Sequence, residues 1–258
     1  DILKREDPDI VISSLPYFVN SIAAPIVIGN GYRYCDLGGR VDVSKMINTL
    51  AGQNNAVVFT DLGLAPGWVN IMAEQGFTEL YGKTAEVTVE MMVGGLPDWL
   101  VSTQNPLRYG LTWSMEGLIN EYKDDCIILE NGEQVIVPGL EGLEQVHSAH
   151  IGHLEAFYTS GGASHTIKSM QDRGVKNCSY KTLRYKGHRD IVKWLIRDCE
   201  LSDEALTDIF SSCGDVSDRD LVIMVATVTA GSKRWHEEKY ITADNKFSAM
   251  QKATGFAI

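Results

Sequence analysis

The stretch Val57-Val-Phe-Thr-Asp-Leu-Gly-Leu-Ala-Pro-Gly-Trp-Val-Asn-Ile-Met-Ala73 decides the fold of this chain. Its first four residues are apolar or β-branched, which predicts a short buried strand. A Gly/Pro turn over 63–67 then breaks the strand, and a helix is expected from Trp68, with Pro66 near its first turn, where a missing N–H costs little. In open α/β sheets such junctions lie at the carboxyl ends of strands, where ligands bind.

The residues before this stretch repeat the same alternation. Strands are predicted over 9–14 and 32–37, and each is followed by a predicted helix, over 19–28 and 41–50. Strands that alternate with helices imply a parallel sheet with right-handed crossovers. Residues 1–80 are therefore expected to form one α/β domain.

The pattern changes after residue 80. Residues 86–92 alternate polar and apolar side chains, which predicts a half-exposed strand that ends at the Gly94-Gly95-Leu96-Pro97 segment. Few crossovers are expected among the later elements, which predicts an antiparallel α+β domain over 81–245 and a helix over 246–258. The elements predicted between these are helices over 115–122, 191–199 and 203–210, a hairpin over 126–137 centred on Asn131-Gly132, and a hairpin over 220–242 turning at Gly231-Ser232.

Composition narrows the class of protein. The 258 residues are 44% hydrophobic and carry a net charge of −11, which is typical of a globular protein and argues against nucleic acid or an anionic membrane as a partner. The five cysteines are widely spaced and include no CxxC pair, so a reducing cytoplasm is expected. His147, His150 and His153 follow each other at intervals of three, but without an HExxH motif we expect no metal site.

Seven short motifs occur in order along the chain. They are Ser13-Ser-Leu-Pro-Tyr17, Cys35-Asp-Leu-Gly-Gly39, Gly63-Leu-Ala-Pro-Gly67, Val93-Gly-Gly-Leu-Pro97, Pro106-Leu-Arg-Tyr109 with Trp113-Ser114, Glu155-Ala-Phe-Tyr-Thr-Ser-Gly-Gly162, and Lys181-Thr-Leu-Arg-Tyr-Lys-Gly-His188. Together they resemble the saccharopine dehydrogenase family, and most closely its L-lysine 6-dehydrogenase branch. The resemblance covers essentially the whole chain.

The resemblance implies a fold and an activity. The first domain would be a partial Rossmann domain, a doubly wound parallel sheet whose first half is missing, because the GxGxxG turn of the family is absent from the 258 residues. The second would be a mixed or antiparallel substrate and dimerisation domain, and the last helix would return to the Rossmann domain. We therefore expect a truncated member of a family that oxidises an amine-bearing carbon of an amino acid with NAD or NADP, acting as a homodimer.

The cofactor residues implied by the resemblance follow three consecutive strand ends. They are Ser14, Leu15, Pro16, Leu37, Gly38, Gly39, Ala65, Pro66 and Gly67. Strand exits allow the backbone to approach a ligand closely, which agrees with this role. Ordinary turn chemistry is the alternative explanation for any single glycine among them.

The resemblance also implies a substrate site and two catalytic candidates. Arg184 would hold the α-carboxylate of the substrate through a two-pronged hydrogen bond, with a surface salt bridge as the alternative. His188 would relay a proton or else cap the helix that follows it. The remaining residues implied to bind substrate are Thr182, Leu183, Gly162 and Trp113.

Glu116 is the second catalytic candidate that the resemblance implies, and it also bears on which substrate is used. Saccharopine-forming enzymes carry arginine at the position that resembles Glu116, and a carboxylate there suits the ammonium of lysine better than the three carboxylates of saccharopine. The alternative is a carboxylate that favours a helix start. Lysine 6-dehydrogenase-like deamination is thus the expected function, with saccharopine dehydrogenase or a non-enzymatic binding or oligomerisation module as alternatives.

Overall fold

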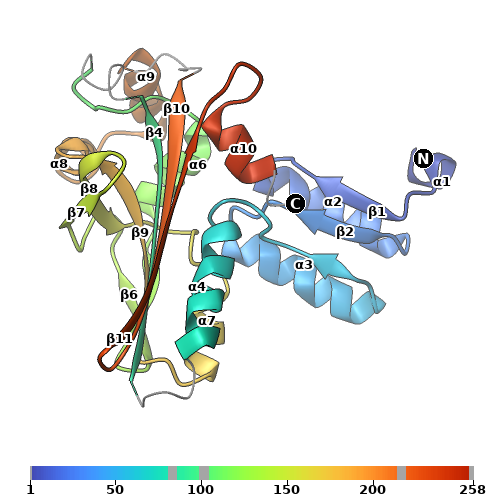
Figure 1. Cartoon of the computed structure of the whole chain (residues 1–258). Helices are drawn as coiled ribbons and strands as arrows, with labels where there is room; N and C mark the ends of the chain where they lie inside the picture. The colour runs from blue at the N-terminus through green and yellow to red at the C-terminus, as the bar shows by residue number, and fades with distance from the viewer. Residues whose placement is uncertain (1, 81–85, 99–104, 214–218, 256–258) are drawn as a thin grey trace.

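The computed structural model describes residues 2–80, 86–98, 105–213 and 219–255. Two sheets organise these residues, a parallel sheet of three strands and a mixed sheet of eight (Figure 1). The α/β plus α+β class predicted from the sequence is confirmed. We call the three-stranded part together with the turn that follows β3, residues 2–67, the small unit and the rest the large unit.

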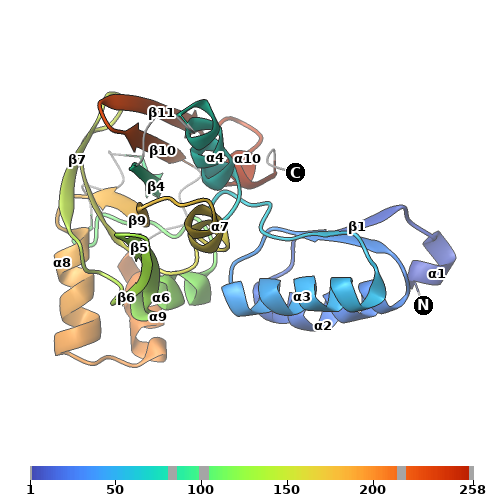
Figure 2. The same ribbon diagram turned by 90° about the horizontal axis from the view of Figure 1, so that it is seen from below.

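The small unit consists of three parallel strands with two helices on one face. In chain order the elements are α1 (Ile2–Glu6), β1 (Ile10–Ser13), α2 (Tyr17–Gly29), β2 (Arg33–Asp36), α3 (Val41–Asn54) and β3 (Val58–Phe59). Strand β2 pairs in parallel with both β1 and β3. Figure 2 shows α2 and α3 side by side on the same face of the sheet. Ala24, Ile28, Tyr34 and Ile47, each at most 1% exposed, form the core between them.

The large unit is built on long antiparallel strands with one parallel pair. The strand order is β11 (Lys233–Thr242), β10 (Asp220–Ala230), β4 (Val87–Pro97), β9 (Asn177–Tyr185), β5 (Cys126–Glu130) and β6 (Glu133–Val137). Strands β4 and β9 are parallel, and β10 pairs antiparallel with both β4 and β11. The hairpins predicted around Asn131-Gly132 and Gly231-Ser232 are confirmed.

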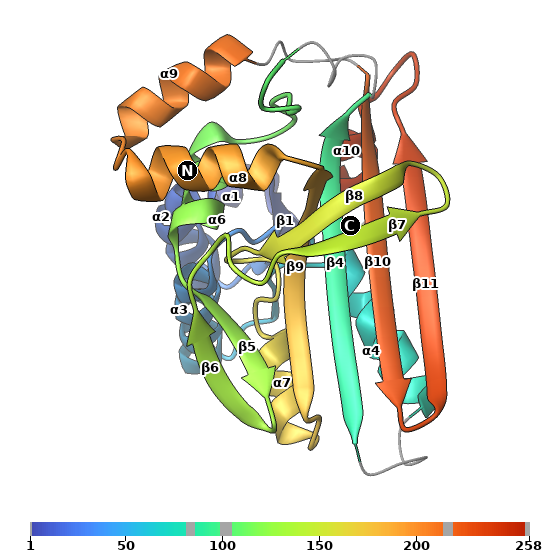
Figure 3. The same cartoon turned by 90° about the vertical axis from the view of Figure 1, so that its left-hand side faces the viewer.

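Helices and a further hairpin cover the large sheet. Helices α4 (Trp68–Leu80) and α10 (Ala249–Gly255) pack on the face that looks toward the small unit (Figure 1). The hairpin β7 (Glu144–Ser148) and β8 (Gly152–Tyr158) lies across the other face (Figure 3), with Leu154 packed against Leu96 and Ile223 in one core cluster. The remaining helices are α6 (Met115–Lys123), α7 (Thr166–Asp172), α8 (His188–Lys193), the π-helical η1 (Trp194–Asp198) and α9 (Asp203–Cys213).

Helix α4 differs from the prediction in its packing. We expected it to complete the parallel domain over 1–80, but Val69, Met72 and Phe77 pack into the core of the large sheet. The helix therefore belongs with the large unit, and we place the boundary at Gly67, directly before the helix, in our own division of the chain. Helix α10 also differs from the expectation that the last helix returns to the Rossmann domain, because Ala249 and Ala253 pack on the large sheet.

Strand β4 also differs from the prediction. It does not end at Gly94 but continues to Pro97, because Gly94 and Gly95 pair with Ile223 and Val222 of β10. It is buried rather than half-exposed, because helix α4 covers one face and the β7–β8 hairpin covers part of the other. Strands β7, β8 and β9 and helix α7 were not predicted.

Candidate active site

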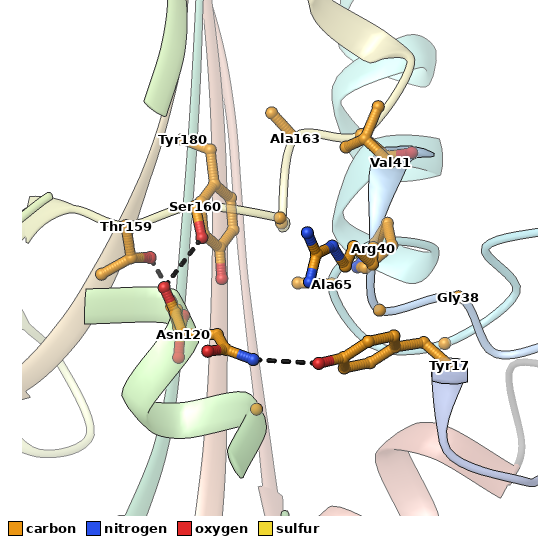
Figure 4. Close-up of a pocket in the computed structure, with 18 of the residues that line it drawn as sticks. Tyr17, Gly38, Arg40, Val41, Ala65, Asn120, Thr159, Ser160, Ala163 and Tyr180 are labelled. Carbon is orange, nitrogen blue, oxygen red and sulfur yellow. Dashed lines mark hydrogen bonds between the residues drawn. The ribbon is translucent and has the colours of Figure 1, made fainter. Parts of the chain in front are cut away.

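A cavity of about 760 Å³ lies between the small unit and the large unit. The carboxyl ends of β1, β2 and β3 and the turns that follow them form one wall. Helix α6, strand β9, the segment after β8 and helix α10 supply the residues of the other wall. Figure 4 shows the two walls, with Tyr17 and Gly38 on one side and Asn120, Thr159 and Tyr180 on the other.

The wall on the small unit contains nearly all the residues predicted to contact a cofactor. The residues of this set that line the cavity are Ser14, Leu15, Pro16, Leu37, Gly38, Gly39, Ala65 and Pro66. Gly67 does not line the cavity. Its N–H donates to Asn70 Oδ1 at 2.7 Å, and its backbone lies against Gly63 at the start of α4.

The turn after β2 has a defined backbone. Gly38 has a φ of +75°, and a Cβ at this position would lie 2.3 Å from Asp61 Oδ1. Asp36 is 2% exposed and accepts hydrogen bonds from the N–H groups of Gly38 and Asp61. Burial raises the pKa of the Asp36 carboxyl. The residue therefore holds the turn and is not placed to contact a ligand.

Asp61 ties the two units together. Ser44 of α3 donates to Asp61 Oδ1 at 2.7 Å, and Ser164 of the large unit donates to Oδ2 at 2.5 Å. His165 Nε2 lies 3.6 Å from the same carboxylate. These contacts connect the ends of β2 and β3 to the segment after β8, which also lines the cavity.

Arg184 of β9 is a buried cation on the opposite wall. Its side chain is 3% exposed, its Nε donates to Tyr122 Oη at 2.9 Å and its Nη1 donates to the carbonyl of Leu183 at 3.0 Å. Its guanidinium carbon lies 4.9 Å from the ring centre of Tyr109 and 5.7 Å from that of Tyr122. Arg184, Thr182, Gly162 and Trp113 all line the cavity. Leu183 does not, because alternation along the strand directs it into the core on the other face.

Glu121 is a second, largely covered charge on this wall that the sequence analysis did not single out. It lies on α6, its side chain is 12% exposed, and Thr159 and Thr182 donate to its Oε1 at 2.9 and 2.7 Å. Its Oε2 lies 3.8 Å from Arg184 Nη2. In the sequence Glu121 is one of several acidic residues on an amphipathic helix, and only its place on the helix face beside Leu118 and Tyr122 could have indicated burial.

Residues 63–258 match the family model of the saccharopine dehydrogenase C-terminal domain. The chain belongs to the saccharopine dehydrogenase family. The family resemblance read from the seven motifs is thereby confirmed, whereas the lysine 6-dehydrogenase branch stays a prediction.

Curated relatives and a solved structure agree with this family. The chain is 26% identical over 200 residues to the mitochondrial alpha-aminoadipic semialdehyde synthase of Mus musculus, a match that covers 74% of this chain and 21% of the relative. It is 22% identical over 206 residues to the saccharopine dehydrogenase [NADP(+), L-glutamate-forming] of Schizosaccharomyces pombe, covering 79% of this chain and 45% of the relative. The chain thus spans less than half the length of these two relatives.

The fold is shared with a saccharopine dehydrogenase structure. The apo histidine-tagged saccharopine dehydrogenase (L-Glu forming) from Saccharomyces cerevisiae superimposes with a TM-score of 0.69 at 15% identity. The match covers 97% of this chain and 75% of that one. The arrangement of both sheets is therefore a family fold.

Glu116 does not line the cavity. The residue is exposed, and its Oε1 accepts a hydrogen bond from Tyr17 Oη at 3.0 Å. Tyr17 Oη in turn accepts a hydrogen bond from Asn120 Nδ2 at 3.0 Å (Figure 4). Tyr17 of the small unit therefore reaches across to α6, and Glu116 stabilises that bridge.

His188 is fully buried behind Arg184 and does not line the cavity. Its Nδ1 lies 2.7 Å from the carbonyl of Leu107, so this nitrogen carries the proton, and its Nε2 accepts from Tyr122 Oη at 2.9 Å. Tyr122 therefore links Arg184 to His188, because its hydroxyl accepts a hydrogen bond from Arg184 Nε and donates one to His188 Nε2. Burial, and next the Arg184 cation, lowers the pKa of His188 to about 3. The structure brings His188 close to Arg184 but not to the cavity, and Gly187, not His188, is the N-cap of α8.

His188 should make the stability of the fold pH-dependent. The folded protein keeps the ring neutral down to a pKa of about 3, whereas the unfolded chain protonates it below about 6.5. The contribution of neutral His188 to the free energy of unfolding is therefore fully present above pH 6.5 and is lost as the pH falls toward 3. When the pH is lowered from 7 to 5, we expect the free energy of unfolding to fall by about 2 kcal/mol more in the wild type than in the His188→Gln variant.

Urea unfolding of both proteins at the two pH values measures this difference. Equal losses in the wild type and the variant would show that His188 is charged in the folded state or titrates alike in both states.

The described residues contain neither a grouped metal-ligand set nor a membrane-spanning helix. Within residues 2–80, 86–98, 105–213 and 219–255, no three His, Cys, Asp or Glu side chains are grouped so as to hold a metal ion. His147 and His153 face each other across the β7–β8 hairpin with ring centres 5.0 Å apart, and His150 stacks on Tyr240. None of the helices in the described part of the chain is long and apolar enough to cross a membrane.

Proposed function

We propose that this chain supplies the amino-acid site of an NAD(P)-dependent oxidoreductase that acts on the CH–NH or CH–NH2 group of an amino acid. Oxidative deamination of the lysine 6-dehydrogenase type is the specific reaction we favour. The observation that carries the proposal is the cavity between three parallel strand ends and the buried Arg184. Strand ends of this kind bind dinucleotides in α/β sheets, and a buried arginine binds a carboxylate.

The wall on the small unit fits the nicotinamide half of such a cofactor. Leu37, Ala65 and Pro66 offer apolar surface, and a Cβ added at Gly39 would meet only Tyr17, at 3.6 Å, so the backbone there is open to a flat ring. When bound, NAD or NADP supplies the hydride acceptor. Because the sequence contains no GxGxxG, we assign no residue of this chain to the pyrophosphate and leave the choice between NAD and NADP open.

The residues of the opposite wall would bind and orient the substrate. Arg184 would hold the α-carboxylate, and its contacts with Tyr122 and Leu183 fix the guanidinium before a ligand arrives. Thr182 and Gly162 would line the path between that carboxylate and the strand ends. His188 would act through Tyr122 as a positioning residue for Arg184 and not by direct contact.

The charge balance of the cavity favours lysine over saccharopine. Four basic residues line it, namely Arg40, Lys45, Lys168 and Arg184, and so do four acidic ones, namely Asp42, Glu121, Asp124 and Asp125. Saccharopine carries three carboxylates and would suit an excess of cations. Saccharopine dehydrogenase activity is the second candidate, because the Schizosaccharomyces pombe relative bears that name.

Steady-state production of NAD(P)H tests the proposal. We expect the chain, joined to a Rossmann half that carries a GxGxxG turn and supplied with NAD+ or NADP+, to have a kcat/KM for L-lysine at least about tenfold above that for saccharopine, because one excess carboxylate without a cation costs about that much. A preference for saccharopine would overturn the lysine assignment. Reduction of neither cofactor with either substrate would favour a non-enzymatic binding or oligomerisation module.

Two further properties stay predictions. We propose a homodimer formed through the large unit, because long sheets of this kind commonly bury their surface against a symmetry mate. We also keep a cytoplasmic location as a prediction from the scattered cysteines.

A further inference from the structure

Glu121 and Arg184 form an incomplete ion pair on the cavity wall. Their closest atoms, Oε2 and Nη2, are 3.8 Å apart, whereas charge-assisted N–H···O bonds close to about 2.7–2.9 Å. Arg184 is buried, Glu121 keeps 12% of its side chain exposed, and both line the cavity. A pair that served stability alone would gain by closing this gap.

The remaining bonds of both side chains hold the gap open. Thr159 and Thr182 both donate to Glu121 Oε1, which fixes this oxygen on the hydroxyls and leaves Oε2 as the oxygen that faces the guanidinium, at 3.8 Å. Arg184 uses Nε on Tyr122 and Nη1 on the carbonyl of Leu183. Within the described residues, neither Glu121 Oε2 nor Arg184 Nη2 has a hydrogen-bond partner. Each group thus keeps one charged atom available on the same side.

The head group of an α-amino acid matches these two atoms. It carries a carboxylate and an ammonium on one carbon. The carboxylate can accept a hydrogen bond from Arg184 Nη2 while the ammonium donates one to Glu121 Oε2. We propose that Glu121 is a specificity-determining residue, whose carboxylate binds the α-ammonium of the amino acid whose α-carboxylate Arg184 binds. This inference rests on the proposed function, since it names how that cavity recognises its substrate.

A head group bound by Glu121 and Arg184 also fixes the direction of the substrate side chain. Glu121 and Arg184 lie on α6 and β9, on the wall opposite the strand ends of the small unit. With its head group fixed there, an amino acid extends its side chain toward Leu37 and Ala65. The far end of the side chain, and not the α-carbon, then lies beside the residues that fit the nicotinamide.

A ligand series isolates the ammonium. L-norleucine carries both charged groups, hexanoate lacks the ammonium, and pentylamine lacks the carboxylate. We expect calorimetric titration of the wild-type chain to show norleucine binding about tenfold or more above either partial ligand. In Glu121→Gln, the affinity for norleucine should fall to within about twofold of that for hexanoate, while the affinity for hexanoate stays within about threefold of wild type.

Matched variants separate recognition from folding. Glu79→Gln removes an exposed carboxylate from helix α4, away from the cavity, and should leave the ranking of the three ligands unchanged. Thr159→Val removes one of the hydroxyls on Glu121 Oε1 and should reduce the preference for norleucine partially, so it serves as the second variant if Glu121→Gln does not fold.

The titrations distinguish recognition of the ammonium by Glu121 from a purely positioning role. Equal losses for norleucine and hexanoate in Glu121→Gln would show that Glu121 only positions Arg184, and equal binding of the two ligands by the wild type, or no binding of norleucine, would also overturn the inference. If the ranking holds but no amino acid reduces NAD(P), the head-group site stands and the proposed oxidoreductase activity falls. If lysine is oxidised but the three ligands do not bind in the expected order, the oxidoreductase activity stands and the head-group site falls.

Discussion

Replacing Arg184 with methionine is expected to lower the free energy of unfolding by about 3 kcal/mol at pH 7. Methionine retains most of the apolar stem but removes the guanidinium. The change leaves the carboxylate of Glu121 buried without a nearby cation and takes the hydrogen-bond donor away from Tyr122 Oη. It also removes the contacts of the cation with the rings of Tyr109 and Tyr122. The low end of the range for buried pairs applies, because Glu121 keeps a little contact with solvent.

A double-mutant cycle assigns this cost. If the uncompensated charge dominates, Arg184→Met combined with Glu121→Gln should be about 1 kcal/mol more stable than Arg184→Met alone. Arg40→Met is the control, because Arg40 pairs with Asp42 at the surface and should change stability by less than about 0.5 kcal/mol. Urea unfolding measures the wild type, Arg184→Met, Glu121→Gln, the double variant and Arg40→Met. A loss below 1 kcal/mol in Arg184→Met would mean that water already reaches the pair.

The same pair shows why the site was only partly predictable. Arg184 was found because its motif resembles the family, but the strand that carries it was missed. Strand β9 alternates Cys178, Tyr180, Thr182 and Arg184 on one face, and polar residues on a central strand obscure the apolar pattern on which the prediction relies. The cavity that accepts those polar side chains is formed by elements far apart in the sequence.

Glu116 and Glu121 illustrate the limit of reading a helix one residue at a time. The motif drew attention to Glu116, which the structure places on the exposed face of α6. Glu121 lies five residues later, which rotates it to the side that packs on Thr159 and Thr182. Which face of α6 is buried depends on β8 and β9, and the sequence analysis predicted neither strand.

The small unit was predicted most fully, because its information is local. Each strand of 4 residues or fewer is followed by a Gly or Pro turn and a helix, and periodicity identifies such units without distant contacts. The partner of helix α4 was not predictable in this way. Its apolar face fits any sheet, and only the strands β4 and β10, which come later in the sequence, make the large sheet its partner.

Replacing Gly67 with alanine is expected to have an effect of similar size, at least about 3 kcal/mol, on the free energy of unfolding. Gly67 has a φ of +138°, which L residues rarely adopt, and an added Cβ would lie 1.9 Å from the carbonyl oxygen of Gly63. That oxygen also accepts a hydrogen bond from the N–H of Trp68 at 2.8 Å. Because the obstacle is backbone and not a flexible side chain, the turn itself must move.

The displaced turn should also weaken the cavity, since Ala65 and Pro66 within it form part of the wall on the small unit. Gly29→Ala is the matched control. Gly29 ends helix α2, and an added Cβ there meets no atom within 4 Å, so alanine should be neutral or stabilise by up to about 1 kcal/mol. Urea unfolding of the two variants gives the comparison. If Gly67→Ala unfolds within 1 kcal/mol of the wild type, the turn relaxes at little cost, and its geometry is not what holds strand β3 and helix α4 in place around the cavity.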